Sequence, residues 1–244
     1  MYNINCTFNY GVAEFKVIST SHTQYPDPVI SICWTSNSSQ ATTIVSGCGD
    51  GSIRIWDAQK NQNSVIGKHA KGIAKVEYVN ECNFIMAMSY NDILALWDPR
   101  SNKPAMQLSF GSLHPLYLTY FYPFVAVLVS ENKVVINDFE TIKRSSKLDF
   151  NYTASNKLKK FYTSFEGFIK GADAPNGFAI GSLDGRIEIK QFIDSYSQLD
   201  VVNEKMNYTF KAHGVKNDTF AVNSIAYNKK YGTLISGVIV SIGS

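Results

Sequence analysis

The side chains that could catalyse a reaction or hold a metal ion are scattered along this chain of 244 residues. No nucleophile lies beside a base, no spacing of metal ligands appears, and the sequence has no phosphate-binding loop. The turn Gly49-x-Gly51 is too short and too close to its strands to hold a dinucleotide. The sequence therefore predicts a protein that is not an enzyme and that uses no metal or other cofactor.

The cysteines are dispersed and form no C-x-x-C pair; they are Cys6, Cys33, Cys48 and Cys82. Several lie in apolar, strand-like segments, so we expect buried free thiols in a reducing compartment. The first residues lack the basic and apolar regions of a secretory signal. No stretch reaches the roughly 20 apolar residues of a membrane span, so membrane insertion is not expected.

Positive side chains gather between Lys143 and Lys170, against fewer acidic ones. Such a surface can bind a polyanion by charge, and the candidates to face RNA are Lys143, Arg144, Lys147 and Lys157. The alternative is a basic surface that is simply solvated. The net charge of +3 does not by itself require a nucleic-acid partner.

The elements that must position these side chains belong to a repeat. Residues 44–57 combine an apolar strand, a glycine-rich turn and an alternating strand that ends in Trp56-Asp57. Residues 84–98 have the same plan and end in Trp97-Asp98. The two tryptophans lie 41 residues apart, which is the spacing of blades in a WD-repeat β-propeller.

Two weaker copies follow in the same register. One covers residues 124–138, with Asn137-Asp138 at the Trp-Asp position, and the other covers residues 177–189. With the strand-like segments between them, they predict an all-β propeller of four complete blades and partial first and sixth blades. No segment with helical periodicity has a useful length. Trp56 and Trp97 are then core residues, and Asp50, His69 and His213 have structural roles where turns meet strands.

Residues 1–244 are expected to form a single propeller domain that is truncated at both ends. The run Val12–Ile18 alternates as a strand should, and no partner strand is expected before it. After the strand near Ala221–Tyr227 the sequence has room for one more.

Three parts of the sequence carry a family resemblance. They are residues 27–34; residues 97–108 and 121–123; and residues 177–186 with 210–213, 221–223 and 232–234. Together they resemble the nuclear poly(A)-mRNA export factors, which are seven-bladed WD-repeat propellers. A sister family carries the Bub kinases in the mitotic checkpoint, and residues 76–78 and 97–100 are closer to that family.

The resemblance implies a short hairpin ligand on the propeller face. In the export branch the hairpin belongs to an FG-repeat nucleoporin, and its paired acidic residues meet arginines of the propeller. Arg186 matches one of these arginines, whereas Thr163 stands at the position of the other, where Lys159 or Lys160 would have to substitute. Tyr90 stands where the family has a tryptophan beside the peptide.

The implied function is a scaffold in nuclear mRNA export, docked at the nuclear pore and found in the nucleus, at the nuclear envelope and in the cytoplasm. One alternative is a spindle-checkpoint propeller that binds hairpins of checkpoint kinases. The other is a propeller that binds single-stranded RNA, as mRNA or ribonucleoprotein, through its basic surface.

An incomplete propeller exposes strand edges that a closed ring protects. We therefore expect the chain alone to be poorly stable, or to be a piece of a longer protein. Urea denaturation with sedimentation analysis tests this expectation. A monomer with one sharp, cooperative transition would contradict it.

Overall fold

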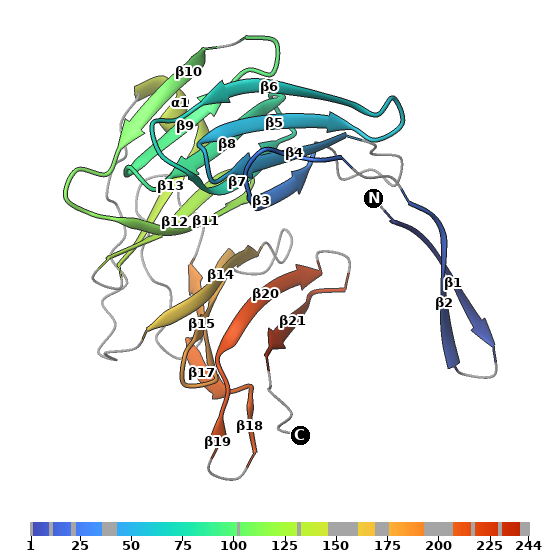
Figure 1. The fold of residues 1–244 in the computed structure, drawn as a ribbon. Coiled ribbons are helices and arrows are strands. Elements are labelled where there is room, and N and C mark those ends of the chain that lie inside the picture. The colour runs from blue at the N-terminus through green and yellow to red at the C-terminus, as the bar shows by residue number, and fades with distance from the viewer. Residues whose placement is uncertain are drawn as a thin grey trace. The chain divides into compact units, whose positions relative to one another are not determined.

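The computed structural model describes eleven segments of the chain, drawn in colour in Figure 1. These are residues 2–9, 12–20, 23–35, 43–101, 103–130, 133–145, 161–168, 176–192, 207–215, 218–228 and 231–239. The chain divides into two compact units, residues 1–109 and residues 110–244. Each unit is described by itself.

The first unit contains two four-stranded antiparallel sheets, each with its strands in chain order. One sheet consists of β3 (Val29–Trp34), β4 (Thr43–Cys48), β5 (Ser52–Asp57) and β6 (Gln62–Lys68). The other consists of β7 (Ile73–Val79), β8 (Phe84–Ser89), β9 (Ile93–Trp97) and β10 (Pro104–Ser109). Both copies of the strongest sequence repeat thus form the sheets that their alternation predicts.

The prediction of an unpartnered strand near the N-terminus was wrong. Strand β2 (Val12–Thr20) pairs along its length with β1 (Tyr2–Asn9), and the two form a separate antiparallel hairpin. The sequence from Tyr2 to Asn9 alternates large and polar residues, which is the signal for a strand. Its many asparagines, which are typical of turns, hide that signal.

The second unit begins with a three-stranded sheet of β11 (Pro115–Phe121), β12 (Phe124–Val129) and β13 (Lys133–Asp138). A four-stranded sheet follows, made of β14 (Tyr162–Phe168), β15 (Asn176–Ser182), β16 (Arg186–Phe192) and β17 (Tyr208–Lys211). Two hairpins complete the unit: β18 (Gly214–Val215) with β19 (Asp218–Thr219), and β20 (Val222–Asn228) with β21 (Thr233–Val238).

A short helix, α1 (Phe139–Ser145), follows β13 where a fourth strand was expected. The Asp138 carboxylate accepts a hydrogen bond from the Thr141 amide at 2.9 Å and so caps the helix. Lys143 and Arg144 occupy its last turn, where positive charge is favoured. With seven residues the helix is too short to show as periodicity, and it agrees with the prediction of an all-β fold without a helical segment of useful length.

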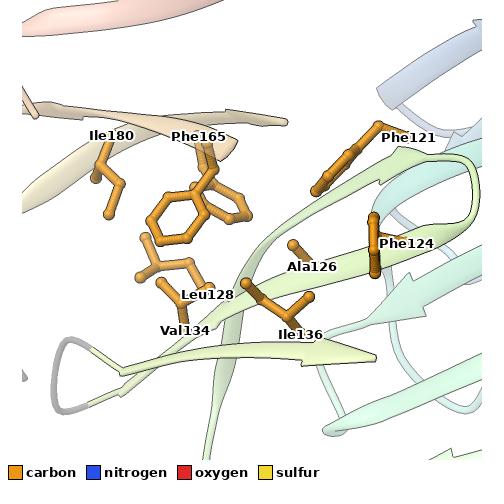
Figure 2. Close-up of a cluster of buried hydrophobic side chains, with 9 residues drawn as sticks. Phe121, Phe124, Ala126, Leu128, Val134, Ile136, Phe165 and Ile180 are labelled. Carbon is orange, nitrogen blue, oxygen red and sulfur yellow. The ribbon is translucent and has the colours of Figure 1, made fainter. Parts of the chain in front are cut away.

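Neighbouring sheets in each unit pack face to face through apolar side chains. In the first unit, Val45 and Ile53 lie in one cluster with Ile73, Val76 and Trp97. In the second unit, Phe165 and Ile180 of the four-stranded sheet point toward Leu128 and Val134 of the three-stranded one (Figure 2). A third cluster joins Ile187 and Ile189 to Val222 at the start of β20.

Hydroxyl groups connect the first strands of neighbouring sheets as well. The Ser31 hydroxyl accepts from the Val76 amide at 3.1 Å, and the Thr119 hydroxyl accepts from the Gly167 amide at 3.1 Å. The Ser164 hydroxyl donates to the Val222 carbonyl at 2.7 Å. Each bond joins a first strand to the next first strand, so the sheets are held in register as well as packed.

Gly67 lies where a side chain cannot fit. A Cβ built on Gly67 would be 2.0 Å from Cζ3 of the buried Trp97 ring. We expect Gly67→Ala to lower the free energy of unfolding by about 1–3 kcal/mol, because Trp97 must shift within a packed core. Urea denaturation measures the change.

Gly49→Ala is the matched control, since a Cβ there meets its nearest atom, the Pro28 carbonyl oxygen, at 3.7 Å. An equal effect of the two substitutions would show that the contact with Trp97 is not the cause.

Candidate peptide-binding site

The same five-residue turn links the second and third strands of three sheets. The turns are Cys48–Ser52, Ser89–Ile93 and Ser182–Arg186. The fourth residue has a positive φ in every case: 85° at Gly51, 61° at Asp92 and 75° at Gly185. The third residue accepts a serine hydroxyl: Asp50 from Ser52, Asn91 from Ser89, and Asp184 from Ser182.

A backbone hydrogen bond fastens each turn to the residue just before the first strand of its sheet. Gly49 donates to the Pro28 carbonyl at 2.9 Å, Tyr90 to Gly72 at 3.0 Å and Leu183 to Phe161 at 2.9 Å. The backbone of the second residue of each turn is thereby held at the end of its sheet. Tyr90, the predicted peptide neighbour, lies at this position with 59% of its surface exposed.

All five residues with predicted structural roles form hydrogen bonds within the protein. His69 is buried, and its Nε2 accepts from the Trp97 indole N–H at 3.2 Å. Trp56 is also buried and its indole N–H donates to Asn61 at 3.3 Å, while His213 Nε2 lies 2.9 Å from the Ser236 hydroxyl. Asp50 accepts from Ser52, and these hydrogen bonds lower the pKa of its carboxyl.

Arg186 begins β16, directly after its turn, with about half of its side chain exposed. Its Nε lies 3.3 Å from the Asp184 carboxylate, which is also about half exposed. The pairing of β16 with β17 places Lys211 directly opposite Arg186. Two positive side chains facing each other across a ladder repel, so this end of the sheet favours an added anion.

Farther along β16, the charged side chains on the same face neutralise each other. Glu188 is buried, and Lys190 Nζ lies 2.9 Å from its carboxylate. Burial raises the pKa of the Tyr162 hydroxyl, and the hydrogen bond and charge of Glu188 add to the effect. The exposed cations of this face are therefore Arg186 and Lys211 at its outer end.

The Thr163 hydroxyl does not take the place of a second arginine. It donates to the Val222 carbonyl at 2.7 Å and so connects β14 with β20.

Lys159 and Lys160, the predicted substitutes, lie outside the described residues, as do Lys147 and Lys157. Lys143 and Arg144 lie exposed on α1, where Lys143 Nζ is 3.8 Å from the Glu140 carboxylate. Tyr90 belongs to the first unit and Arg186 to the second.

Sequence reasoning missed Lys211 and Asp184 as neighbours of Arg186. The recurrence of Asp or Asn as the third residue of the turns, two positions from a serine, was a usable signal for Asp184. The position of Lys211 depends on the register of β17, which follows a long polar segment and cannot be counted from the sequence.

The described residues contain no group of three or more His, Cys, Asp or Glu side chains placed to hold a metal ion. Among them, no helix has the length and apolar character needed to cross a membrane.

These repeated turns and face-to-face sheets define a WD-repeat β-propeller, and comparison confirms the class. Residues 15–57 match the family "WD domain, G-beta repeat". The β-propeller domain of Cps50 (Swd1) from Myceliophteria thermophila superposes with a TM-score of 0.59 at 14% identity, covering 91% of this chain and 65% of that one. This likeness concerns the fold alone.

The resemblance to mRNA export factors is also confirmed. The chain is 27% identical over 226 residues to "mRNA export factor rae-1" of Caenorhabditis elegans and 28% identical over 217 residues to "Poly(A)+ RNA export protein" of Schizosaccharomyces pombe. Each match covers 86% of this chain and 56% of the relative. The "mRNA export factor" of Xenopus tropicalis is 28% identical, covering 90% and 58%. The chain thus spans just over half the length of these relatives.

The burial of His69 makes stability depend on pH. Burial lowers the pKa of His69 below its usual 6.5, so the folded state holds the imidazole neutral. As the pH falls through 6.5 the unfolded chain binds a proton that the folded chain does not, so this contribution is present above pH 6.5 and is lost below it. We expect the urea concentration at the unfolding midpoint to decrease as the pH is lowered from 7.5 to 5.5.

His69→Gln keeps an acceptor for Trp97 without a titrating ring, so its urea midpoint should fall less over the same interval. A variant whose midpoint follows the wild-type pH dependence would exclude His69 as the source.

Proposed function

We propose that this propeller is a non-enzymatic scaffold in nuclear mRNA export that docks an acidic nucleoporin hairpin at the nuclear pore. The relatives named as mRNA export factors support the process, and they match most of this chain. The protein then resides in the nucleus and at the nuclear envelope, and passes into the cytoplasm with its cargo.

The observation that carries the docking proposal is the state of Arg186. Its side chain is half exposed at the end of a sheet, opposite a second cation, and its guanidinium forms a salt bridge with the half-exposed Asp184. An exposed ion pair of this kind contributes little to stability, so an incoming carboxylate can displace Asp184 at low cost. The guanidinium fork can then hold a glutamate of the hairpin by two hydrogen bonds.

The rigidity of the turn favours such a site. The Leu183 amide is bound to Phe161 on one side, and the Gly185 carbonyl accepts from the Ala212 and His213 amides at 2.8 and 3.0 Å on the other. A guanidinium carried by a fixed backbone loses less freedom on binding than one on a mobile loop. The second acidic residue of the hairpin is assigned to Lys211, since Thr163 is occupied within the fold.

We expect Arg186→Ala to weaken binding of a synthetic nucleoporin hairpin peptide by roughly 10- to 100-fold. The reason is that a charge-assisted hydrogen bond contributes about 1.5–3 kcal/mol, and about 1.4 kcal/mol corresponds to a factor of ten. Arg186→Lys should recover only part of the affinity, because an ammonium cannot form the paired contact. Isothermal titration calorimetry with the full chain measures both.

Arg144→Ala is the matched control, because it removes an exposed arginine from α1 in the same unit. The proposal fails if the wild-type chain does not bind the peptide, or if Arg186→Ala and Arg144→Ala weaken binding equally.

A further inference from the structure

Two large apolar side chains lie exposed beside Arg186. Phe161 has 78% of its surface exposed and Leu183 has 55%. The Leu183 amide donates to the Phe161 carbonyl, so their backbones are adjacent. Leu183 shares its turn with Asp184 and directly precedes the Arg186 ion pair.

The same hydrogen bond occurs in four sheets, which allows a comparison of equivalent positions. The other pairs are Pro28 with Gly49, Gly72 with Tyr90, and His114 with Ser130, whose bond is 2.7 Å. None of these pairs places two large apolar side chains together. The packing of a blade therefore does not require an apolar pair at this position. The side chains of Phe161 and Leu183 are exposed to solvent, and this exposure does not favour folding.

We infer that Phe161 and Leu183 form an apolar contact for one large apolar side chain of the acidic hairpin. This inference deepens the proposed function and rests on it. The partner is an acidic peptide because Arg186 and Lys211 face each other across the ladder at this end of the sheet, where an added carboxylate relieves their mutual repulsion. The opposed pair of cations thus favours an occupant that carries a carboxylate.

The geometry sets the spacing of the ligand. Leu183 and Arg186 belong to one tight turn, in which Gly185 donates to the Ser182 carbonyl at 3.2 Å. A strand advances about 3.3 Å per residue, so an extended ligand reaches from one side chain to the other within about three residues. The ligand therefore has a large apolar residue no more than about three positions from the glutamate that meets Arg186.

The turn is prevented from rearranging around another ligand. A Cβ on Gly185 would lie 2.1 Å from the His213 carbonyl oxygen and 2.9 Å from that of Phe220. The backbone at Gly185 is thus enclosed, which limits rearrangement of the turn between Leu183 and Arg186. A contact that is rigid before binding supports selection of a defined spacing.

The test measures peptide affinity for Phe161→Ser, Leu183→Ser and the double variant by calorimetry. The probe is the synthetic nucleoporin hairpin, together with versions in which each large apolar residue near the glutamates is replaced by alanine. We expect each substitution in the protein to weaken binding by roughly tenfold, as for a central apolar contact. One alanine peptide should lose affinity for the wild type and show no further loss with Phe161→Ser.

Leu116→Ser is the control, because Leu116 is 47% exposed on β11 of the same unit. Urea midpoints of the variants should match the wild type, since the substituted side chains are exposed.

The outcomes separate the two proposals. Binding that depends on Arg186 but is unchanged by Phe161→Ser and Leu183→Ser overturns this inference alone. A wild-type chain that does not bind the hairpin overturns both. Concentration-dependent dimers that Phe161→Ser dissolves would assign the apolar pair to a second copy of the chain and would also overturn the inference.

Discussion

A single backbone hydrogen bond organises the ends of the sheets. It runs from the second residue of each turn to the residue before the first strand, and it occurs in four sheets with lengths between 2.7 and 3.0 Å. In three of these turns a later residue takes up a left-handed conformation, which glycine adopts readily and aspartate tolerates. Tyr90 is itself the donor of that bond in one sheet, and Arg186 lies three residues after the donor Leu183 in another.

The architecture was predictable where the repeat is strong. Two Trp-Asp strands at blade spacing, with glycine or asparagine in the turns, sufficed to predict the sheets of the first unit. The prediction failed where local signals opposed the pattern. Asparagines hid the strand at Tyr2–Asn9, and Asp138 capped a helix at a position where the blade plan called for a strand.

The candidate site was only partly predictable for a related reason. Arg186 follows directly from the turn motif and the family resemblance, and the structure shows it exposed. Its surroundings depend on residues brought close by strand pairing. The register of β17 places Lys211 opposite Arg186. The Thr163 hydroxyl donates to the Val222 carbonyl of the next hairpin. Neither relation is encoded in nearby sequence.

The enclosure of Gly185 has a consequence for how the protein is made. The carbonyls of His213 and Phe220 close over that turn, and the amides of Ala212 and His213 bind its carbonyl. Synthesis proceeds from the N-terminus, so the strands β14 to β16 leave the ribosome before these residues do. Arg186 therefore reaches its final setting only after the chain has been extended past Phe220, and the docking surface that we propose is among the last features of the second unit to form.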